Sequence, residues 1–539
     1  MAIITIKSYG GVSPRMPARY LPDNMAQTAL NCDLNNTSLK PLSGLGSSLL
    51  TLPKMGVPLT IYRFGQDIIS DTQYWFHWTI DVDVCRSQIT GDTSEWTFYT
   101  GDGAPKATYA ALATAGSDYP AASRPLGLPA PTTPLTLTLG SFTPAPEDTT
   151  ETRVYVWTWV NKEAGYEFES APSPVSASIN VYTGQSVVLS GRGTVPSGYV
   201  VTHWRVYRAV AGTFLFVAEV PVANTGYTDS VLSEGLGEEL PSLTWLPPPE
   251  TLKGLINLPN GVMAAFTGRD VYFCDPYHPH AWPLQYVQSV DSPVVGLGRM
   301  DTTLAVLTTG TPYFMQGSSP DSTVVVKSDL EQACSSKRSI VSTNGVVLYS
   351  SPDGLVMLAT SGSKLVTEQY FTRAQWQAQF KPDSIHAYAH EQKYYGFYNT
   401  GSVQGGFIYD LVTGQFTLHD LYATAGYTDL LRDKLFLAFS DRSLKVWGAG
   451  SAKTYTWKSK RFTLPQVTGF SCAQVEAEAY PVTAKFYAAG TLMHTQTVSG
   501  RTPFRLPVAA ERDWEVQLEG SSEVFSVAIA TSMEELANV

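Results

Sequence analysis

A strand–turn–strand unit that recurs in the second half of the chain is the feature that most constrains its fold. Each unit is an apolar or aromatic run, a turn with Gly or Asp, and a second apolar run. Five units are clear: 261–274, 303–315, 345–358, 393–410 and 434–447. They recur about every 40 residues, which is the length of one β-propeller blade. We therefore expect propeller blades over residues 247–450.

Residues 57–120 are dense in aromatic side chains, as in Tyr74-Trp75-Phe76. Propellers often close their ring with strands from distant parts of the chain, because closure removes exposed sheet edges. We expect this region to complete the propeller, or a platform beside it, which predicts about five to seven blades. Asp81 and Asp83 alternate with valines there, and we interpret them as a solvated strand face because further metal ligands are missing nearby.

Two further β modules are predicted. The proline-rich stretch at 120–134 is typical of a linker, and alternating strands follow it, such as 153–160 and 203–208. Residues 121–246 therefore predict a fibronectin III/Ig-like β-sandwich inserted before the propeller. Short alternating runs over 451–539 predict a small C-terminal β-sandwich. The expected fold class is mainly β and multi-domain, with one helix at 372–380 that Thr372 caps.

The N-terminal 56 residues form an arm whose glycines and prolines prevent a helix or an independent fold. Such a segment must lie against another surface, and we expect it to tie modules or neighbouring subunits together. Deletion of residues 8–42 should then leave folded monomers that cannot form rings. The predicted interface residues are Gly11, Pro14, Arg15, Arg19, Tyr20, Leu21, Pro22 and Pro41.

Charge and cysteine content narrow the possible functions. The 539 residues carry a formal net charge of −11, which argues against tight nucleic-acid binding, since phosphate affinity comes mainly from Lys and Arg. Lys458, Lys460 and Arg461 form the main basic cluster, which we interpret as a solvated surface. The five cysteines lack C-x-x-C spacing and indicate reduced, buried thiols. The start of the chain lacks the pattern of a signal peptide, so we expect synthesis and assembly in a cytoplasm.

Catalytic and metal signatures are weak. The Gly-Leu-Gly triplets at 235–237 and 296–298 lack the rest of a dinucleotide fingerprint, and no Gly-x-Ser-x-Gly occurs. His278 and His280 flank a proline without a further ligand at metal spacing, which favours a polar loop. His386 and His390 read as part of a strand. We expect no enzyme activity, catalytic residue, cofactor or bound metal.

Several short motifs resemble the tail nozzle, or tail tubular protein B, family of short-tailed bacteriophages. The resemblance covers nearly the whole chain. It lies in Gly-Gly-Val-Ser-Pro-Arg (10–15), Leu-Pro-Asp-Asn-Met-Ala (21–26), Leu-Lys-Pro-Leu (39–42), Leu-Gly-Leu-Pro-Ala-Pro (126–131), Glu-Ser-Ala-Pro-Ser-Pro (169–174), Phe-Thr-Arg-Ala-Gln-Trp (371–376) and Trp-Lys-Ser-Lys-Arg-Phe (457–462).

The resemblance implies a virion protein: a homohexameric ring at the distal end of the tail, through which double-stranded genomic DNA passes into the host. Its implied partners are a portal-side adaptor ring, a tailspike or fibre, and the host envelope at ejection. Acidic or uncharged polar side chains should then line the channel. Two alternatives remain open: a glycan-binding or glycan-cleaving propeller at the tail tip, and an adaptor ring that holds tailspikes.

Overall fold

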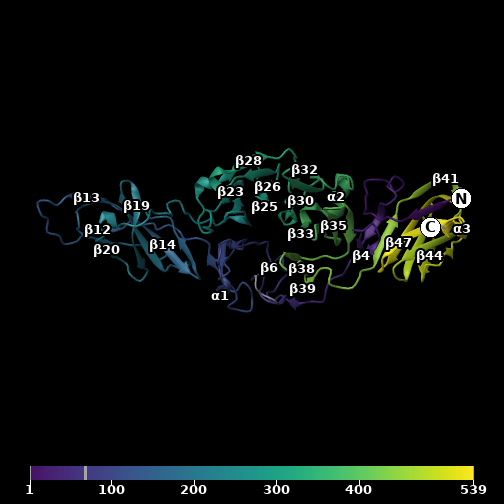
Figure 1. The fold of residues 1–539 in the computed structure, drawn as a ribbon, viewed down its shortest axis with the longest axis horizontal. Coiled ribbons are helices and arrows are strands. Elements are labelled where there is room, and N and C mark those ends of the chain that lie inside the picture. Colours follow the sequence, from purple (N-terminus) through teal and green to yellow (C-terminus); the bar gives the residue numbers. More distant parts are fainter. Residues whose placement is uncertain (1, 66–69, 538–539) are drawn as a thin grey trace.

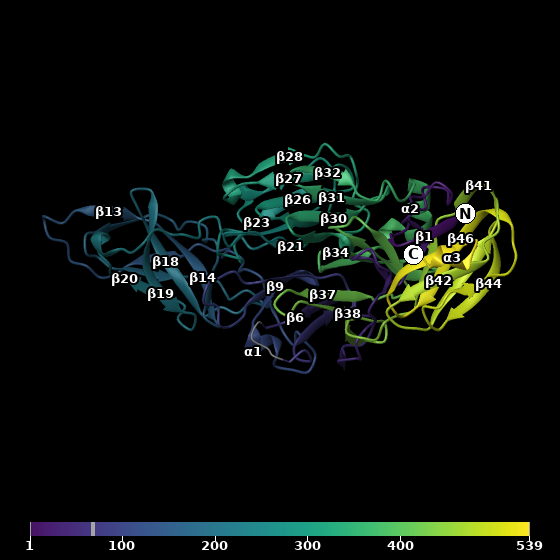
Figure 2. The ribbon, with the colours of Figure 1, turned by 45° about the vertical axis from the view of Figure 1, so that its right-hand side comes forward.

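The computed structural model describes residues 2–65 and 70–537. These residues are almost entirely β-structure, arranged as an elongated body (Figures 1 and 2). A β-sandwich occupies one end, a propeller the middle and a second β domain the other end, where both termini lie. The mainly β, multi-domain fold class expected from the sequence is confirmed.

The five repeat units form the middle strand pairs of five consecutive four-stranded blades, as expected. The first three blades are β21 (Lys253–Asn257), β22 (Met263–Thr267), β23 (Asp270–Phe273) and β24 (Gln288–Ser289); β25 (Val294–Met300), β26 (Thr303–Thr308), β27 (Tyr313–Gln316) and β28 (Val324–Lys327); and β29 (Val341–Thr343), β30 (Val346–Ser350), β31 (Leu355–Ala359) and β32 (Gly362–Leu365). The next two are β33 (His386–His390), β34 (Lys393–Asn399), β35 (Gln404–Asp410) and β36 (Phe416–His419); and β37 (Ala425–Asp429), β38 (Lys434–Ala438), β39 (Ser443–Val446) and β5 (Leu50–Thr51).

Two sheets from the aromatic region complete the ring. They are the hairpin β6 (Thr60–Arg63) and β7 (Trp75–Trp78), and the four strands β8 (Asp83–Arg86), β9 (Thr97–Gly101), β10 (Gly103–Thr108) and β11 (Arg124–Pro125). The inner strand β6 contacts β37, and β8 contacts β21. Val82 N donates to Thr60 Oγ1 between the two sheets. The described residues therefore form a closed propeller of seven blades.

The expected domain boundary at residue 121 is wrong by a few residues. Arg124 and Pro125 pair with β10 and still belong to a blade. The proline is tolerated because β11 is an edge strand, where one missing donor costs little. The sandwich therefore leaves the propeller after β11 and returns at β21, so it is inserted between two blades.

The inserted domain is a β-sandwich, as expected. Its larger sheet consists of β15 (Tyr166–Glu169), β14 (Tyr155–Glu163), β18 (His203–Val210) and β19 (Thr213–Pro221). The smaller sheets are β12 (Thr136–Leu139), β17 (Val187–Ser190) and β20 (Tyr227–Asp229), and the pair β13 (Thr150–Arg153) and β16 (Ile179–Tyr182). Trp157 and Trp204 are fully buried between them.

The C-terminal domain packs two sheets face to face. One contains β1 (Ile3–Ile6), β47 (Val524–Ala530), β42 (Cys472–Ala477) and β45 (Phe504–Arg505). The other contains β40 (Tyr455–Ser459), β46 (Glu511–Gly520), β43 (Val482–Ala488), β44 (Thr491–Val498) and β41 (Phe462–Thr468). Since β1 comes from the arm, the expected domain of 451–539 is completed by the first residues of the chain.

The α-helices in the described residues are few and short: α1 (Ala110–Ala113), α2 (Arg373–Phe380) and α3 (Met533–Leu536). The expected helix is α2, and Thr372 caps it as predicted in a capping box with Gln375. Within the described residues, no helix has the length and apolarity that a membrane span requires.

Candidate functional site: the N-terminal arm

The arm supplies a strand that joins the propeller to the C-terminal domain. Strand β2 (Ala26–Leu30) lies parallel to β36 of the fourth blade, with Leu30 opposite Leu418. Its other edge pairs antiparallel with β40 of the C-terminal domain. The blade, the arm and the C-terminal sheet therefore form one ten-stranded sheet. The main chain, rather than surface side chains, makes this connection.

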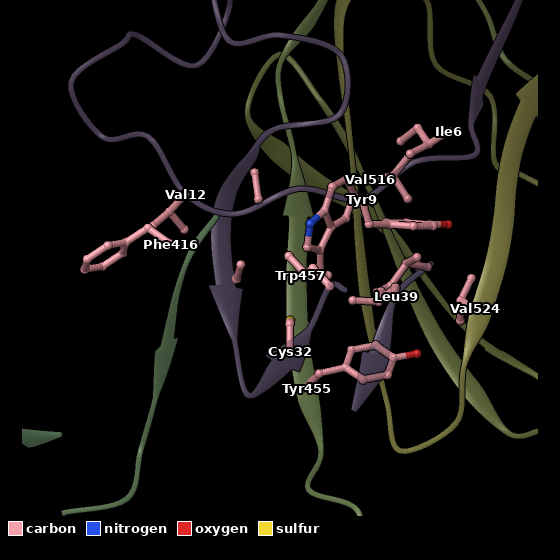
Figure 3. Close-up of a cluster of buried hydrophobic side chains, with 14 of the residues drawn as sticks. Ile6, Tyr9, Val12, Cys32, Leu39, Phe416, Tyr455, Trp457, Val516 and Val524 are labelled. Carbon is pink, nitrogen blue, oxygen red and sulfur yellow. The ribbon is translucent and has the colours of Figure 1, made fainter. Parts of the chain in front are cut away.

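A buried aromatic cluster lies under β2 (Figure 3). Tyr9 meets Trp457 edge-to-face, with ring centroids 4.8 Å apart, and both side chains are fully buried. The indole Nε1 of Trp457 donates to the Gly10 carbonyl at 3.0 Å. Val12 and Phe416 extend the cluster toward the blade. The arm is thus part of a hydrophobic core that runs from the fourth blade into the C-terminal domain.

Gly11 marks the closest approach of the arm to the blade. Its amide donates to Gln415 Oε1 at 2.7 Å, and the next amide, of Val12, donates to the Phe416 carbonyl at 2.9 Å. A Cβ atom at Gly11 would lie 2.2 Å from that carbonyl oxygen. Only glycine fits here, because the obstacle is backbone and cannot rotate away.

These contacts contradict one expectation from the sequence. Deletion of residues 8–42 would remove β2 from the central sheet, together with the buried Tyr9, Val12 and Leu39. The C-terminal domain would lose part of its core, so a folded monomer is not the expected product. The modules do need the arm as an internal tie, and its role between subunits must be tested by point substitutions.

Between Val12 and β2 the arm makes an outward loop of residues 13–25 (Figure 3). Its first half is held by the propeller: the Arg15 amide donates to the Tyr370 carbonyl at 2.8 Å, and Arg15 Nη1 donates to the Glu368 carbonyl at 2.6 Å. Gln375 Nε2 of helix α2 donates to the Pro14 carbonyl at 2.9 Å. The blade side therefore fixes the loop through backbone groups.

The C-terminal domain holds the second half of the loop. The Arg461 amide donates to the Ala18 carbonyl at 2.9 Å, and Lys460 Nζ pairs with Asp23 Oδ1 at 2.9 Å. Arg19 and Tyr20 lie between these anchors. The loop is thus tethered on both sides, with these two residues at its tip.

The basic cluster at 458–461 is not the solvated surface expected from the sequence. Lys458 Nζ lies 2.7 Å and Arg461 Nε 2.8 Å from the two oxygens of Glu515, whose side chain is 1% exposed. Burial acts to raise the pKa of Glu515, but the hydrogen bonds from Lys458 and Arg461 outweigh it and hold that pKa below its ordinary value. The cluster therefore stabilises the part of the C-terminal domain that holds the arm loop.

The structure separates the eight predicted interface residues into two groups. Gly11 and Leu21 are buried within the chain, and Pro41 is half-buried in β4 (Lys40–Pro41), which pairs with β3 (Cys32–Asp33). The exposed ones are Pro14, Arg15, Arg19, Tyr20 and Pro22. Tyr9, Val12 and β2, which carry the intramolecular contact, were missed by the sequence reasoning. The available signal was that Tyr9, Val12 and Ala26 are apolar residues within an arm that is otherwise rich in polar residues, glycines and prolines.

Asp81 and Asp83 lie beside a lysine rather than on an open strand face. Lys337 Nζ is 2.6 Å from Asp83 Oδ2 and 3.1 Å from Asp81 Oδ2, and it comes from the segment that precedes the third blade. Burial acts to lower the pKa of Lys337, but the carboxylates of Asp83 and Asp81 outweigh it and raise that pKa. The Gly254 amide also donates to Asp83. The aspartates therefore link blades across the ring.

The candidate histidines lie at the junction between the sandwich and the propeller and in the fourth blade. His280 is buried, and its Nε2 accepts from the Glu169 amide of the sandwich at 3.3 Å. Burial lowers the pKa of His280 to about 3, with a smaller contribution from His278. His386 and His390 lie in β33, as expected for a strand. No group of three or more His, Cys, Asp or Glu side chains with metal-binding geometry occurs in the described residues.

Comparisons with known proteins leave the family open. No protein-family model and no curated protein matches the chain. Among solved structures, BBS1N in complex with ARL6DN is 10% identical, with a TM-score of 0.24 over 49% of this chain and 86% of that one. A puromycin-hydrolysing peptidase of Mycobacterium tuberculosis is 10% identical, with a TM-score of 0.27 over 85% and 62%. Hsv2 of Kluyveromyces marxianus is 9% identical, with a TM-score of 0.21 over 51% and 88%. The propeller assignment rests on strand pairing and not on these similarities.

Proposed function

We propose that this chain is a structural subunit of a short bacteriophage tail, forming with identical copies the nozzle ring through which the genome leaves. The observation that carries the proposal is the arm. Its motifs at 10–15 and 21–26 bear the resemblance to tail nozzle proteins, and they frame a loop anchored on two domains with an exposed tip. An anchored loop of this kind suits contact with a neighbouring subunit.

The acidic net charge and the paired basic residues support a channel that does not bind DNA tightly. The chain is acidic overall, and the basic residues Lys458, Lys460 and Arg461 form ion pairs with Glu515 and Asp23. Unpaired basic residues in a channel would bind phosphate and slow the passage of DNA. In this proposal the ring contacts a portal-side adaptor and a tailspike or fibre, and meets the host envelope at ejection.

Electron microscopy of the purified full chain and of labelled virions tests the proposal. We expect ring particles with a central hole, and a C-terminal label at the distal end of the tail axis. Particles that remain monomeric at all concentrations would contradict it. Binding to a glycan array, or depolymerisation of host polysaccharide, would instead indicate a receptor-recognition propeller. Co-purification with a spike but no place on the axis would indicate an adaptor.

A further inference from the structure

A cavity opens between the first two blades, away from the arm. Its volume is about 360 Å³, at the lower end of the roughly 300–1,000 Å³ typical of ligand pockets. Loops that follow β21, β25 and β27 frame it. Leu258, Phe273, Leu304 and Met315 supply apolar lining, and Asn260 and Ser318 supply polar groups. No charged side chain lines it in the described residues, so it suits an uncharged, mainly apolar group.

One carboxylate flanks this cavity. Asp321 directly follows the lining residue Pro320, whereas the carboxylate of Asp301, the residue before the lining residue Thr302, lies beside Gly345 of the third blade. Asp321 is exposed, and it forms no ion pair in the part of the chain that the structure describes. An occupant that places an apolar side chain inside and a cation at the rim would therefore match the cavity in both polarity and charge.

The tip of the arm loop has this chemistry. Tyr20 is 70% exposed, and Arg19 beside it is exposed as well. Neither side chain has a hydrogen bond, ion pair or ring contact within the described residues. An exposed tyrosine next to an arginine is typical of residues that dominate protein interfaces. Because the loop is anchored on both sides, it presents this pair without a large loss of loop freedom on binding.

One chain cannot bring its own tip to its own cavity. The arm loop lies where the propeller meets the C-terminal domain (Figures 1 and 2). The cavity is lined by residues of the first two blades, and these blades lie on the side of the propeller toward the sandwich. Hydrogen bonds to Tyr370 and Arg461 hold the base of the loop in place. The occupant must then come from another molecule.

We propose that Tyr20 of one copy inserts into this cavity of a second copy, with Arg19 facing Asp321 at its rim. The two surfaces are different patches of the same chain, so the contact is head-to-tail, and repetition yields a ring when the rotation closes. This inference rests on the proposed homo-oligomer and names its contact surfaces. It also assigns distinct roles to the arm: buried residues tie domains, and exposed ones tie subunits.

Charge reversal in the full-length chain tests the inference by sedimentation velocity and electron microscopy. Arg19→Asp or Asp321→Arg alone should weaken assembly by at least about tenfold, since each places like charges together. The double variant should assemble again. An equimolar mixture of the two single variants should also assemble with the variants alternating, because every contact between unlike variants joins opposite charges. Tyr20→Ala should abolish assembly, and Lys364→Asp, an exposed control on β32, should not change it.

The outcomes distinguish failure of the proposed Tyr20 contact from failure of the proposed ring. Single variants that fold, shown by unchanged melting temperatures, and still assemble like the wild type would overturn the inference and leave the ring intact. Loss of assembly that neither the double variant nor the mixture restores would overturn the Arg19–Asp321 pairing. A wild-type chain that stays monomeric would overturn the second copy as occupant and also the proposed ring.

Discussion

The two ends of the propeller are joined to their neighbours in different ways. At the C-terminal domain, β2 extends a blade into a ten-stranded sheet through main-chain pairing on both of its edges. At the sandwich, no strand ladder crosses the boundary in the described residues. There the contact consists of packed aromatic side chains and of bonds such as the Glu169 amide to His280, and Arg124 Nη2 to Glu163 at 3.0 Å.

This difference predicts different mechanical behaviour. Separation of the two domains at this boundary would break backbone hydrogen bonds, so the propeller and the C-terminal domain should unfold as one unit. The sandwich shares the buried cluster around Trp157 and Trp204 with propeller residues such as Trp96, and these side-chain contacts can be lost one at a time. We therefore expect it to loosen first, and three substitutions can sharpen or break this comparison.

Gly11→Ala should have the largest effect. The added Cβ would meet the Phe416 carbonyl, and the strain should lower the free energy of unfolding of the joined unit by about 3 kcal/mol. Chemical denaturation followed by tryptophan fluorescence measures it. Gly500→Ala is the matched control, because a Cβ there meets nothing within 4 Å. Equal stability of the two variants would show that the arm is not tightly docked.

Glu515→Gln should have an intermediate effect. It leaves Lys458 and Arg461 without their shared carboxylate and should cost about 2 kcal/mol, less than a fully buried pair because both cations are partly solvated. The sign of the pH dependence follows from the lowered pKa of Glu515. Its stabilisation is present above the ordinary value of 4.5 and is lost as the pH falls through the folded-state pKa. Denaturation curves at neutral and acidic pH should show a smaller decline for the variant, and an unchanged decline would contradict this assignment.

His280→Ala should have the smallest effect on the joined unit, below about 1 kcal/mol, because it lies at the side-chain junction. Proteolysis of the linker at 126–135 should nevertheless become faster. Since the pKa of His280 is lowered to about 3, its contribution is fully present above the ordinary 6.5 and declines as the pH falls. Hydrogen exchange should show the loss in the sandwich alone. Equal loss in the C-terminal domain would remove the proposed contrast between the two junctions.

Much of the fold could be predicted because its signals are local. The five repeats in the second half are the middle strand pairs of five blades. They could be recognised from the sequence because alternating apolar residues and tight turns are properties of short segments. Helix α2 was predicted for the same reason, from Thr372 and the residues that follow it. The approximate role of the arm also followed from its glycines and prolines, which require an external support.

The partners of each strand could not be predicted, because pairing depends on residues hundreds of positions apart. Nothing local in Ala26–Leu30 indicates that its neighbours are β36 and β40, or that Lys458 and Arg461 face Glu515. For the same reason, the ion pairs of Lys337 with Asp81 and Asp83 could not be predicted.

By itself, then, the sequence determined the β-strand content, the blade repeat and the presence of a dependent arm, since these follow from local periodicity and backbone preference. Only the tertiary structure decided how that arm is used. Its buried half completes two domains because their sheets leave an edge between them. Its tip stays exposed, with no partner among the described residues, because the loop is held at both sides.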